Sequence, residues 1–232
     1  MAASLPLDYH IDDQYQFSLT KDEVMFMKDE TVGRQVSVMV DGKIPLQSVE
    51  GFTLLKRNVI DNSDIIEAVR SYLQCETDDQ PLGLGLYRTL GPVPGAYAFR
   101  RSYPGQFAES VLVHLLPKHS KIRIWKGIDR RAEVPVRMGE IPLWQADNLG
   151  LGNAGLKCRE EVFDQGGWCV RDTRVFIEVL SGKAFTFAIA KLPLPQMWHR
   201  MKVHKSLRST VEEIQTATFE IRAEYYDNEG QD

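Results

Sequence analysis

The stretch GGWCVRDTRVFIEVLSGKAFTFAIA, residues 166–190, reads as two apolar strands joined by a glycine-containing turn. In its second strand the large residues Phe185, Phe187 and Ile189 alternate with small ones. Neither face of such a strand suits full exposure, so we expect both faces to be covered. The pattern favours a β-barrel or a β-sandwich, and it says more about architecture than about activity.

Composition predicts a globular protein with a substantial core. The chain has 232 residues, of which 43% are hydrophobic and 26% are charged. All-β domains often reach about 200–250 residues as one unit, so we expect a single domain over residues 1–232. The formal net charge of −4 argues against a nucleic-acid partner, because such proteins usually carry a strongly basic domain or stripe.

The cysteines and the N-terminal residues indicate where in the cell the protein is expected. Cys75, Cys158 and Cys169 are odd in number and lack CxxC spacing, which favours reduced thiols over a disulfide framework. The first residues show no basic segment followed by an apolar one, and no run approaches ~18 apolar residues. We therefore expect a cytoplasmic protein without a membrane partner.

Residues 1–60 are predicted to contain the N-terminal strands. Residues 15–18 and 35–40 have strand-like composition. The dipeptide Asp41-Gly42 is a strong turn signal before residues 43–46, so the second of these segments is expected to begin a hairpin.

A helix is predicted over residues 64–75, followed by loops. Ile65, Val69 and Leu73 form one apolar stripe after a capping residue at 63 or 64. The glycines of residues 82–86 and the glycines and prolines of residues 91–95 favour turns or extended loops. No Lys-Ser or Lys-Thr follows the first of these stretches, so a phosphate-binding loop is not expected.

The second half is predicted to hold the core barrel, residues 95–190. Residues 110–116 and 121–125 are strand-like and are separated by a short turn, which predicts a second hairpin. Prolines stop the last strand, and a capping box at Ser209 predicts a short helix over residues 209–218. The polar tail, residues 225–232, is expected to fray.

Three short features point to a known family. The strand pattern of residues 107–125, the motif Gly127-Ile128-Asp129 and the motif Asp172-Thr173-Arg174 occur in that order. Together they resemble the double-stranded β-helix of cupin-like proteins and phytanoyl-CoA dioxygenase-like oxygenases. The resemblance covers roughly residues 95–190. It implies a mostly β, single-domain jelly roll with one or two short helices.

The metal ligands of that oxygenase family are missing from the matching positions. Where the family places its distal histidine, this chain has Val175, Phe176 and Ile177, none of which binds iron. Where the family places its His-x-Asp pair, residues 97–101 offer neither imidazole nor carboxylate. The facial triad cannot be assembled there, so we expect no metal and no cofactor, and we do not expect an active Fe(II)/2-oxoglutarate oxygenase.

Two polar residues interrupt apolar strands and are the sharpest catalytic candidates. His114 shares a strand face with Leu112 and Leu116, and Glu178 lies between two apolar pairs. If both face one pocket, they can act as a general acid and base. The alternative is that each is a strand-edge, solvent-facing or hydrogen-bonded residue without chemistry.

The expected ligand contacts are one arginine and several aromatic residues. Arg174 either pairs with Asp172 in a structural ion pair or binds a substrate carboxylate. Trp125, Trp168 and Phe176 are expected to line an apolar ligand cavity, with ordinary core packing as the alternative.

The sequence thus predicts a jelly-roll protein that binds an apolar small molecule. One expectation is a metal-independent cyclase, isomerase or lyase in which His114 and Glu178 move protons. A non-catalytic binding or interaction module and an oxygenase with unorthodox ligands are the alternatives, since jelly rolls host unrelated chemistries. Paired edge strands allow a homodimer, although nothing in the sequence requires one.

Overall fold

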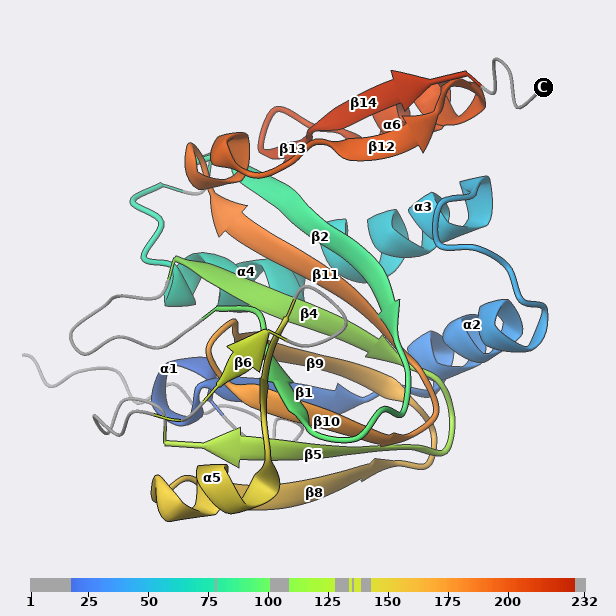
Figure 1. Cartoon of the computed structure of the whole chain (residues 1–232). Coiled ribbons are helices and arrows are strands. Elements are labelled where there is room, and N and C mark those ends of the chain that lie inside the picture. Colours follow the sequence, from blue (N-terminus) through green and yellow to red (C-terminus); the bar gives the residue numbers. More distant parts are fainter. Residues whose placement is uncertain are drawn as a thin grey trace, which may run out of the picture.

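The strands of this chain form two six-stranded sheets and a small third sheet, and strand residues outnumber helical ones (Figure 1). The structure, a computed structural model, describes residues 18–77, 79–100, 109–127, 134, 136–138 and 143–227. In order across the first sheet lie β1 (Val24–Lys28), β9 (Gly167–Asp172), β4 (Ser110–Leu116), β11 (Ala184–Lys191), β2 (Leu82–Leu90) and β13 (Phe219–Ile221). In order across the second lie β6 (Arg137–Met138), β7 (Trp144–Ala146), β3 (Ala96–Ala98), β10 (Phe176–Ser181), β5 (Ser120–Lys126) and β8 (Lys157–Phe163).

The helices gather mainly near the N-terminus. They are α1 (Leu19–Asp22), α2 (Glu30–Asp41), α3 (Val49–Leu55), the π-helical turn η1 (Lys56–Ile60), α4 (Ser63–Tyr72), α5 (Asn148–Asn153), η2 (Leu194–Met197), η3 (Lys205–Leu207) and α6 (Arg208–Ile214). Within the part of the chain that the structure describes, no helix combines the length and the apolar character needed to cross a membrane.

The first sheet is buried on both faces. On one face Val113 and Phe187 belong to a core that also contains Phe52 of α3 and Val69 of α4. On the other face its residues share a second core with the second sheet, and the rings of Phe26 and Phe163 meet there edge to face at 5.7 Å. The molecule is therefore layered as helices, first sheet and second sheet.

The stretch 166–190 forms three strands rather than the predicted two. β9 ends at Asp172, a tight turn follows in which the Val175 amide donates to the Asp172 carbonyl at 3.1 Å, and β10 begins at Phe176. β9 and β11 belong to the first sheet and β10 to the second, so the chain changes sheet at each turn. The predicted coverage of both faces of residues 184–190 is confirmed, since every residue there is buried.

The strands predicted around residues 110–125 are present, but the hairpin between them is wrong. β4 pairs with β9 and β11, whereas β5 pairs with β8 and β10. All residues of β4 are buried, while buried and part-exposed residues alternate along β5. β4 is covered on both faces, as expected for a strand of the central sheet, whereas β5 is covered on one face only. The two strands therefore belong to different sheets, and the short connection between them crosses from one sheet to the other.

The predicted hairpin over residues 35–46 is also wrong, because this region forms helix α2. The Asp29 side chain accepts hydrogen bonds from the amides of Thr31 and Val32 and caps the first turn. Val32, Val36 and Met39 then lie on one buried stripe with helical spacing. Asp41 and Gly42 end the helix instead of turning a hairpin. Of the predicted strand 15–18, residues 15–17 lie outside the described residues.

The helix predicted over residues 64–75 is present as α4, but it begins at Ser63 and ends at Tyr72, and Asn62 caps it instead of residue 63 or 64. The prediction of a loop over residues 82–86 is wrong, since they open β2. A Cβ at Gly85 would lie 1.8 Å from the ring of Trp198, and one at Gly83 would lie 2.7 Å from the ring of Pro195. The glycines are therefore explained by close ring packing on a strand rather than by a turn.

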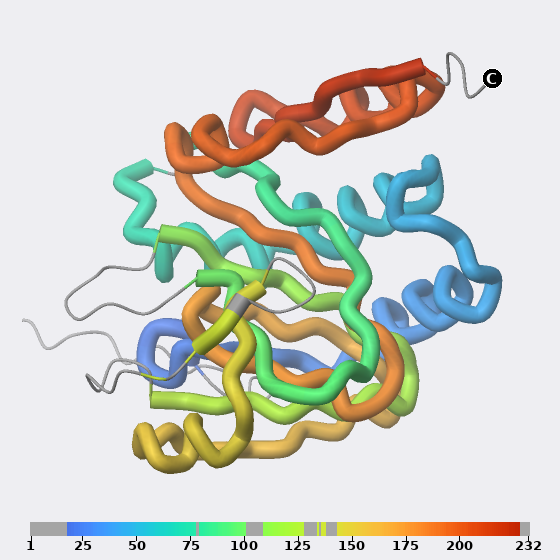
Figure 2. Tube along the Cα trace, in the orientation of Figure 1, coloured from blue at the N-terminus to red at the C-terminus, as the bar shows by residue number. Residues whose placement is uncertain are grey.

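The C-terminal segment, drawn in red in Figure 2, lies beyond β2, and its strand β13 pairs with β2 at the edge of the first sheet. α6 ends at Ile214, short of the predicted residue 218, because Thr216 pairs with Phe219 and turns the chain into β13. Tyr225 and Tyr226 do not fray: they belong to β14 (Ala223–Tyr226), which pairs in parallel with β12 (Met201–His204). The tail from residue 228 onward lies outside the described residues.

Candidate functional site

A row of polar side chains crosses the face of the first sheet that meets the second sheet. Thr186 of β11 pairs with His114 of β4 on one side and with Arg88 of β2 on the other, and His114 pairs with Cys169 of β9. Residues paired across neighbouring strands point to the same face. Arg171, two residues beyond Cys169, therefore points to this face as well. We call Arg88, His114, Arg171 and Thr186 the inter-sheet polar cluster.

His114 is held by hydrogen bonds at both ring nitrogens. Its Nδ1 lies 2.9 Å from Thr186 Oγ1, and Arg171 Nε donates to its Nε2 at 2.8 Å. Since Nε2 accepts, the hydrogen-bond network assigns the ring proton to Nδ1. The ring is fully buried, and burial together with the Arg171 charge holds the pKa of His114 well below its ordinary value. His114 is thus a neutral imidazole.

Arg171 is a fully buried cation that forms no ion pair with a carboxylate among the residues the structure describes, although the Asp172 charge acts on it. Its Nη1 donates to the carbonyls of Val175 and, at 3.4 Å, Asp172, while Nη2 is buried and makes no hydrogen bond with any described group. Burial lowers the pKa of Arg171 to about 10, so the guanidinium stays protonated at neutral pH. Buried charges in proteins are normally paired, which makes this one unusual.

A second guanidinium in the same row is also incompletely satisfied. Arg88 Nη1 is buried and, within the described part of the chain, has no hydrogen-bond acceptor. Its cross-strand partner is Thr186, which also contacts His114, so Arg88 and Arg171 flank the pair formed by His114 and Thr186. These two arginines, each with an N–H group that has no acceptor among the described residues, lie on one face of the first sheet and provide a binding surface for an anion.

The surroundings of the cluster are largely apolar, with a charged rim at the strand ends. Ile122, Ile124 and Ile177 of the second sheet belong to the core between the sheets. The rim residues pair with one another: Lys126 Nζ lies 3.5 Å from Asp22 Oδ1, and Arg159 pairs with Glu161. The rim charges are therefore neutralised locally, unlike those of the two arginines in the cluster.

The structure does not bring His114 and Glu178 together. Glu178 lies on the outer face of the second sheet, where Arg123 donates to it at 2.7 Å and Asn148 of α5 donates at 3.4 Å. Two of the predicted ligand contacts, Trp125 and Phe176, are cross-strand partners on that same outer face and are buried. These three residues are neighbours, but a whole sheet separates them from His114.

The remaining predicted residues lie on the helix side of the first sheet or in a turn. Trp168 is fully buried in the core that contains the helices. Arg174 forms a two-point ion pair with Asp172, with Nε–Oδ1 at 2.9 Å and Nη2–Oδ2 at 2.7 Å, and Tyr72 of α4 donates to the same carboxylate. The structural ion pair, one of the two alternatives for Arg174, is thus present. Its charge is already satisfied.

The site residues that sequence reasoning missed are Arg171, Arg88 and Thr186. Arg171 stands in the otherwise apolar run that opens β9 and has the same strand parity as Cys169, a signal visible in the sequence. Arg88 and Thr186 come close to Arg171 only because β2, β11, β4 and β9 lie side by side in the first sheet, and the sequence does not reveal that strand order. No cluster of three or more His, Cys, Asp or Glu side chains suited to a metal ion occurs among the described residues.

No protein-family model and no curated protein matches this sequence. Among solved structures, AviO1 from Streptomyces viridochromogenes Tue57 overlaps 76% of this chain and 93% of its own, at 10% identity and a TM-score of 0.44. The non-heme monooxygenase ThoJ in its apo form overlaps 75% of this chain and 76% of its own, at 12% identity and a TM-score of 0.44. The ThoJ–nickel complex gives 11% identity and a TM-score of 0.40 over the same shares. At these scores the overlap carries no information about ligand or reaction.

Proposed function

We propose that the two larger sheets form a double-stranded β-helix, or jelly roll. Strand order supports this proposal. The strands β2, β4, β9 and β11 of the first sheet have the chain neighbours β3, β5, β8 and β10 in the second. Reading across, the first sheet runs β9-β4-β11-β2 and the second runs β8-β5-β10-β3. Each of these strands of the first sheet thus has its neighbour in sequence at the equivalent position of the second sheet. This arrangement is typical of a jelly roll, in which a long hairpin folds so that its two halves form two facing sheets.

We propose that this chain binds a small organic molecule with an apolar body and a carboxylate group, held between the two sheets. The observation that supports this most directly is that two guanidinium groups, the fully buried one of Arg171 and the half-buried one of Arg88, each hold a buried nitrogen that lacks an acceptor among the described residues. A carboxylate supplies two acceptor oxygens and a compensating charge. The isoleucines of the second sheet suit the apolar body.

His114 has a positioning role in this proposal. Its two ring nitrogens are engaged by Thr186 and Arg171, so the imidazole cannot accept a proton from a ligand without giving up the Arg171 contact. Its acceptor Nε2 instead fixes the orientation of the guanidinium. The site therefore supports binding more directly than proton transfer, because the described residues beside His114 do not include Glu178, the partner that the isomerase or lyase expectation requires.

Titrating matched acids and amides tests this function. Cyclohexanecarboxylate is compared with cyclohexanecarboxamide, and benzoate with benzamide, by thermal shift and by ligand-observed NMR. We expect the acids to bind saturably and to raise the melting temperature, since a ligand that binds only the folded state stabilises it. The amides, which lack the charge, should bind at least tenfold more weakly.

Arginine variants assign the effect to the site. Arg171→Met and Arg88→Met keep an extended apolar side chain and should each lose the preference for acids over amides. Arg123→Met is the matched control, because Arg123 lies on the outer face of the second sheet. Acid binding that survives in both variants, or equal binding of acids and amides to the unaltered protein, would refute the proposal.

A further inference from the structure

A shallow apolar groove of about 400 Å³ lies between α2 and the segment formed by α3 and η1. Its floor contains Met39 and Leu54, which are buried, and its walls include Val38 and Val49, which are 60% and 52% exposed. Exposed valines facing a common hollow differ from single surface apolar residues, which need no explanation. The helices α2 and α3, whose residues line the groove, lie on the helix side of the first sheet (Figure 1), whereas the inter-sheet polar cluster lies on its other face.

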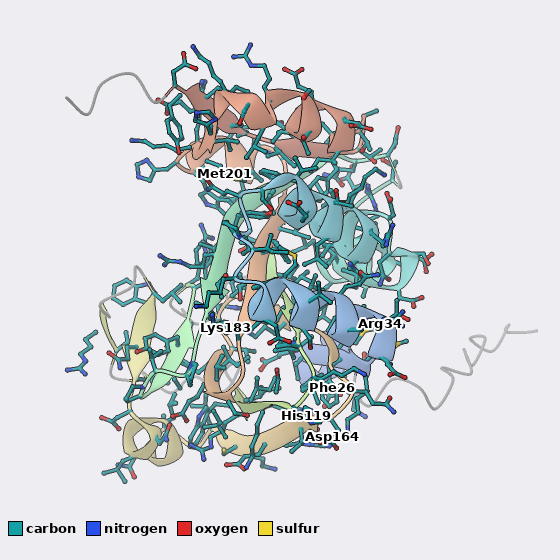
Figure 3. All side chains as sticks on the ribbon, turned by 90° about the vertical axis from the view of Figure 1, so that its right-hand side faces the viewer. Phe26, Arg34, His119, Asp164, Lys183 and Met201 are labelled. Carbon is teal, nitrogen blue, oxygen red and sulfur yellow. The ribbon has the colours of Figure 1, made fainter. Side chains whose placement is uncertain are left out.

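The groove has a cationic end and an apolar end. The Asn58 side chain donates to Gln35 at 2.8 Å, which places the start of α2 beside the end of α3 and η1. Arg34 and Arg57 line the groove at this end, and the Arg34 side chain lies on the face shown in Figure 3. Among the described residues no carboxylate lies within ion-pair distance of either arginine, and Glu30, whose pKa the Arg34 charge helps to lower, pairs with Lys118 instead.

The opposite end carries the apolar walls and one acidic residue. Val38 lies near the end of α2, and Val49 and Glu50 open α3. Glu50 and Arg57 are seven positions apart along α3 and η1, which corresponds to about 10 Å along the axis. A negative charge at the apolar end and two positive charges at the other give the groove a direction for an elongated anion.

We propose that this groove binds a free, single-chain carboxylate of medium length, with the carboxylate near Arg34 and Arg57 and the alkyl chain along Val38 and Val49. A volume of about 400 Å³ lies within the range of small-molecule sites. The two arginines select the anionic head group, and Glu50 disfavours the reversed orientation. This site is independent of the proposed function, because no residue is shared between them.

The test is a titration of the ¹⁵N-labelled protein with decanoate and, separately, with decyltrimethylammonium, both below their micelle concentrations. The two amphiphiles have the same chain and opposite charges. We expect decanoate to bind saturably and to shift the amide signals of α2, α3 and η1. We expect decyltrimethylammonium to bind at least fivefold more weakly.

Surface variants separate the contributions of the two ends. Val38→Asp should weaken decanoate binding at least tenfold, because it places a carboxylate against the alkyl chain. The double variant Arg34→Gln and Arg57→Gln should weaken it about fivefold and abolish the preference over the cation. Val162→Asp, at a 41% exposed valine of β8, and Arg200→Gln, at an exposed arginine, are the matched controls and should bind as the unaltered protein does.

Three results would overturn the proposal. One is equal affinity for the two amphiphiles, and another is the absence of saturable shifts at α2, α3 and η1. The third is binding to phosphatidylglycerol vesicles without binding to free decanoate, which would assign the groove to a membrane surface. Arg171→Met should leave the shifts in the groove intact, so a failure of the inter-sheet proposal is distinguishable from a failure of this one.

Discussion

At the scale of single residues, the most unusual feature is the hydrogen bond between the neutral imidazole of His114 and the buried guanidinium of Arg171. His114 accepts from Arg171 and contacts Thr186, with no carboxylate to favour its protonated form among the hydrogen-bond partners that the structure describes. Burial and the neighbouring positive charge both oppose protonation, so folded His114 stays neutral at pH values where an unfolded histidine is charged. This difference links the stability of the fold to pH.

The linkage predicts that His114 contributes to acid destabilisation. The pKa of His114 in the folded state lies below the unfolded value of about 6.5. As the pH falls below about 6.5, the unfolded state therefore binds a proton at this residue while the folded state does not. Stability is then lost downward from about pH 6.5. Between pH 7 and pH 5.5 the free energy of unfolding should fall by about 1 kcal/mol more in the unaltered protein than in His114→Gln. Urea unfolding at both pH values measures this.

The glutamine variant keeps an acceptor for Arg171 but removes the titration. His199→Gln, at an exposed histidine, should retain the full pH dependence of the unaltered protein. If the free energy of unfolding had the same pH dependence in His114→Gln as in the unaltered protein, the pKa of His114 would not be lowered by folding, and this prediction would be wrong.

The sequence predicted part of this site and missed the rest for an identifiable reason. His114 stood out because it interrupts an apolar strand, and that reading placed it correctly in the interior. Its proposed partner, Glu178, lies on the other sheet's outer face, because strand alternation sets the face of a residue within its own strand but not which strands oppose each other. Arg171 and Arg88 come together only through the order of strands in the first sheet.

At the scale of elements, the docking of α2 depends on Gly33. A Cβ at this position would lie 1.9 Å from the carbonyl oxygen of Gln165 and 2.7 Å from the Cα of Gly166, both of which are backbone atoms. The helix therefore approaches the turn between β8 and β9 at a distance that admits no side chain. A glycine inside a helix normally lowers its stability by about 1 kcal/mol relative to alanine, so its presence here is explained by packing.

Gly33→Ala should consequently destabilise the protein although alanine is the better helix former. Because the obstructing atoms are backbone, the helix must move, and we expect a loss of about 3 kcal/mol in the free energy of unfolding. Gly152→Ala in α5, where an added Cβ meets nothing within 4 Å, should change stability by at most about 1 kcal/mol, in the stabilising direction. Equal effects of the two substitutions in urea unfolding would contradict this account of α2.

The elements themselves show where local sequence is sufficient. α4 was predicted because its apolar stripe, cap and length agree, and β4, β5 and β11 because their apolar runs are long. Residues 35–46 were misread because the strand-like run Val36 to Val40 and the Asp41-Gly42 signal outweighed the Asp29 cap and the spacing of Val32, Val36 and Met39. The false hairpin over residues 110–125 has a different cause: it assumes that strands joined by a short connection pair, whereas here that connection changes sheets.

At the scale of the whole molecule, the first sheet is shared by two cores. Phe187 packs on its helix side, and Cys169 and Phe26 pack on the side of the second sheet. Because β11, β4 and β9 supply side chains to both cores, neither the helices nor the second sheet has a complete apolar partner without the first sheet. Loss of the first sheet therefore exposes both cores at once.

This sharing predicts that the described parts of the chain unfold in one cooperative transition. Phe187→Ala, in the core with the helices, and Phe163→Ala, in the core between the sheets, both remove a fully buried ring and should each cost about 3–5 kcal/mol. Each substitution should shift the whole transition, so circular dichroism and tryptophan fluorescence, which includes Trp168 on the helix side and Trp125 on the second sheet, should give coincident urea curves. If one variant separated the two signals into distinct transitions, the helices and the second sheet would be independent units, and the first sheet would belong to only one of them.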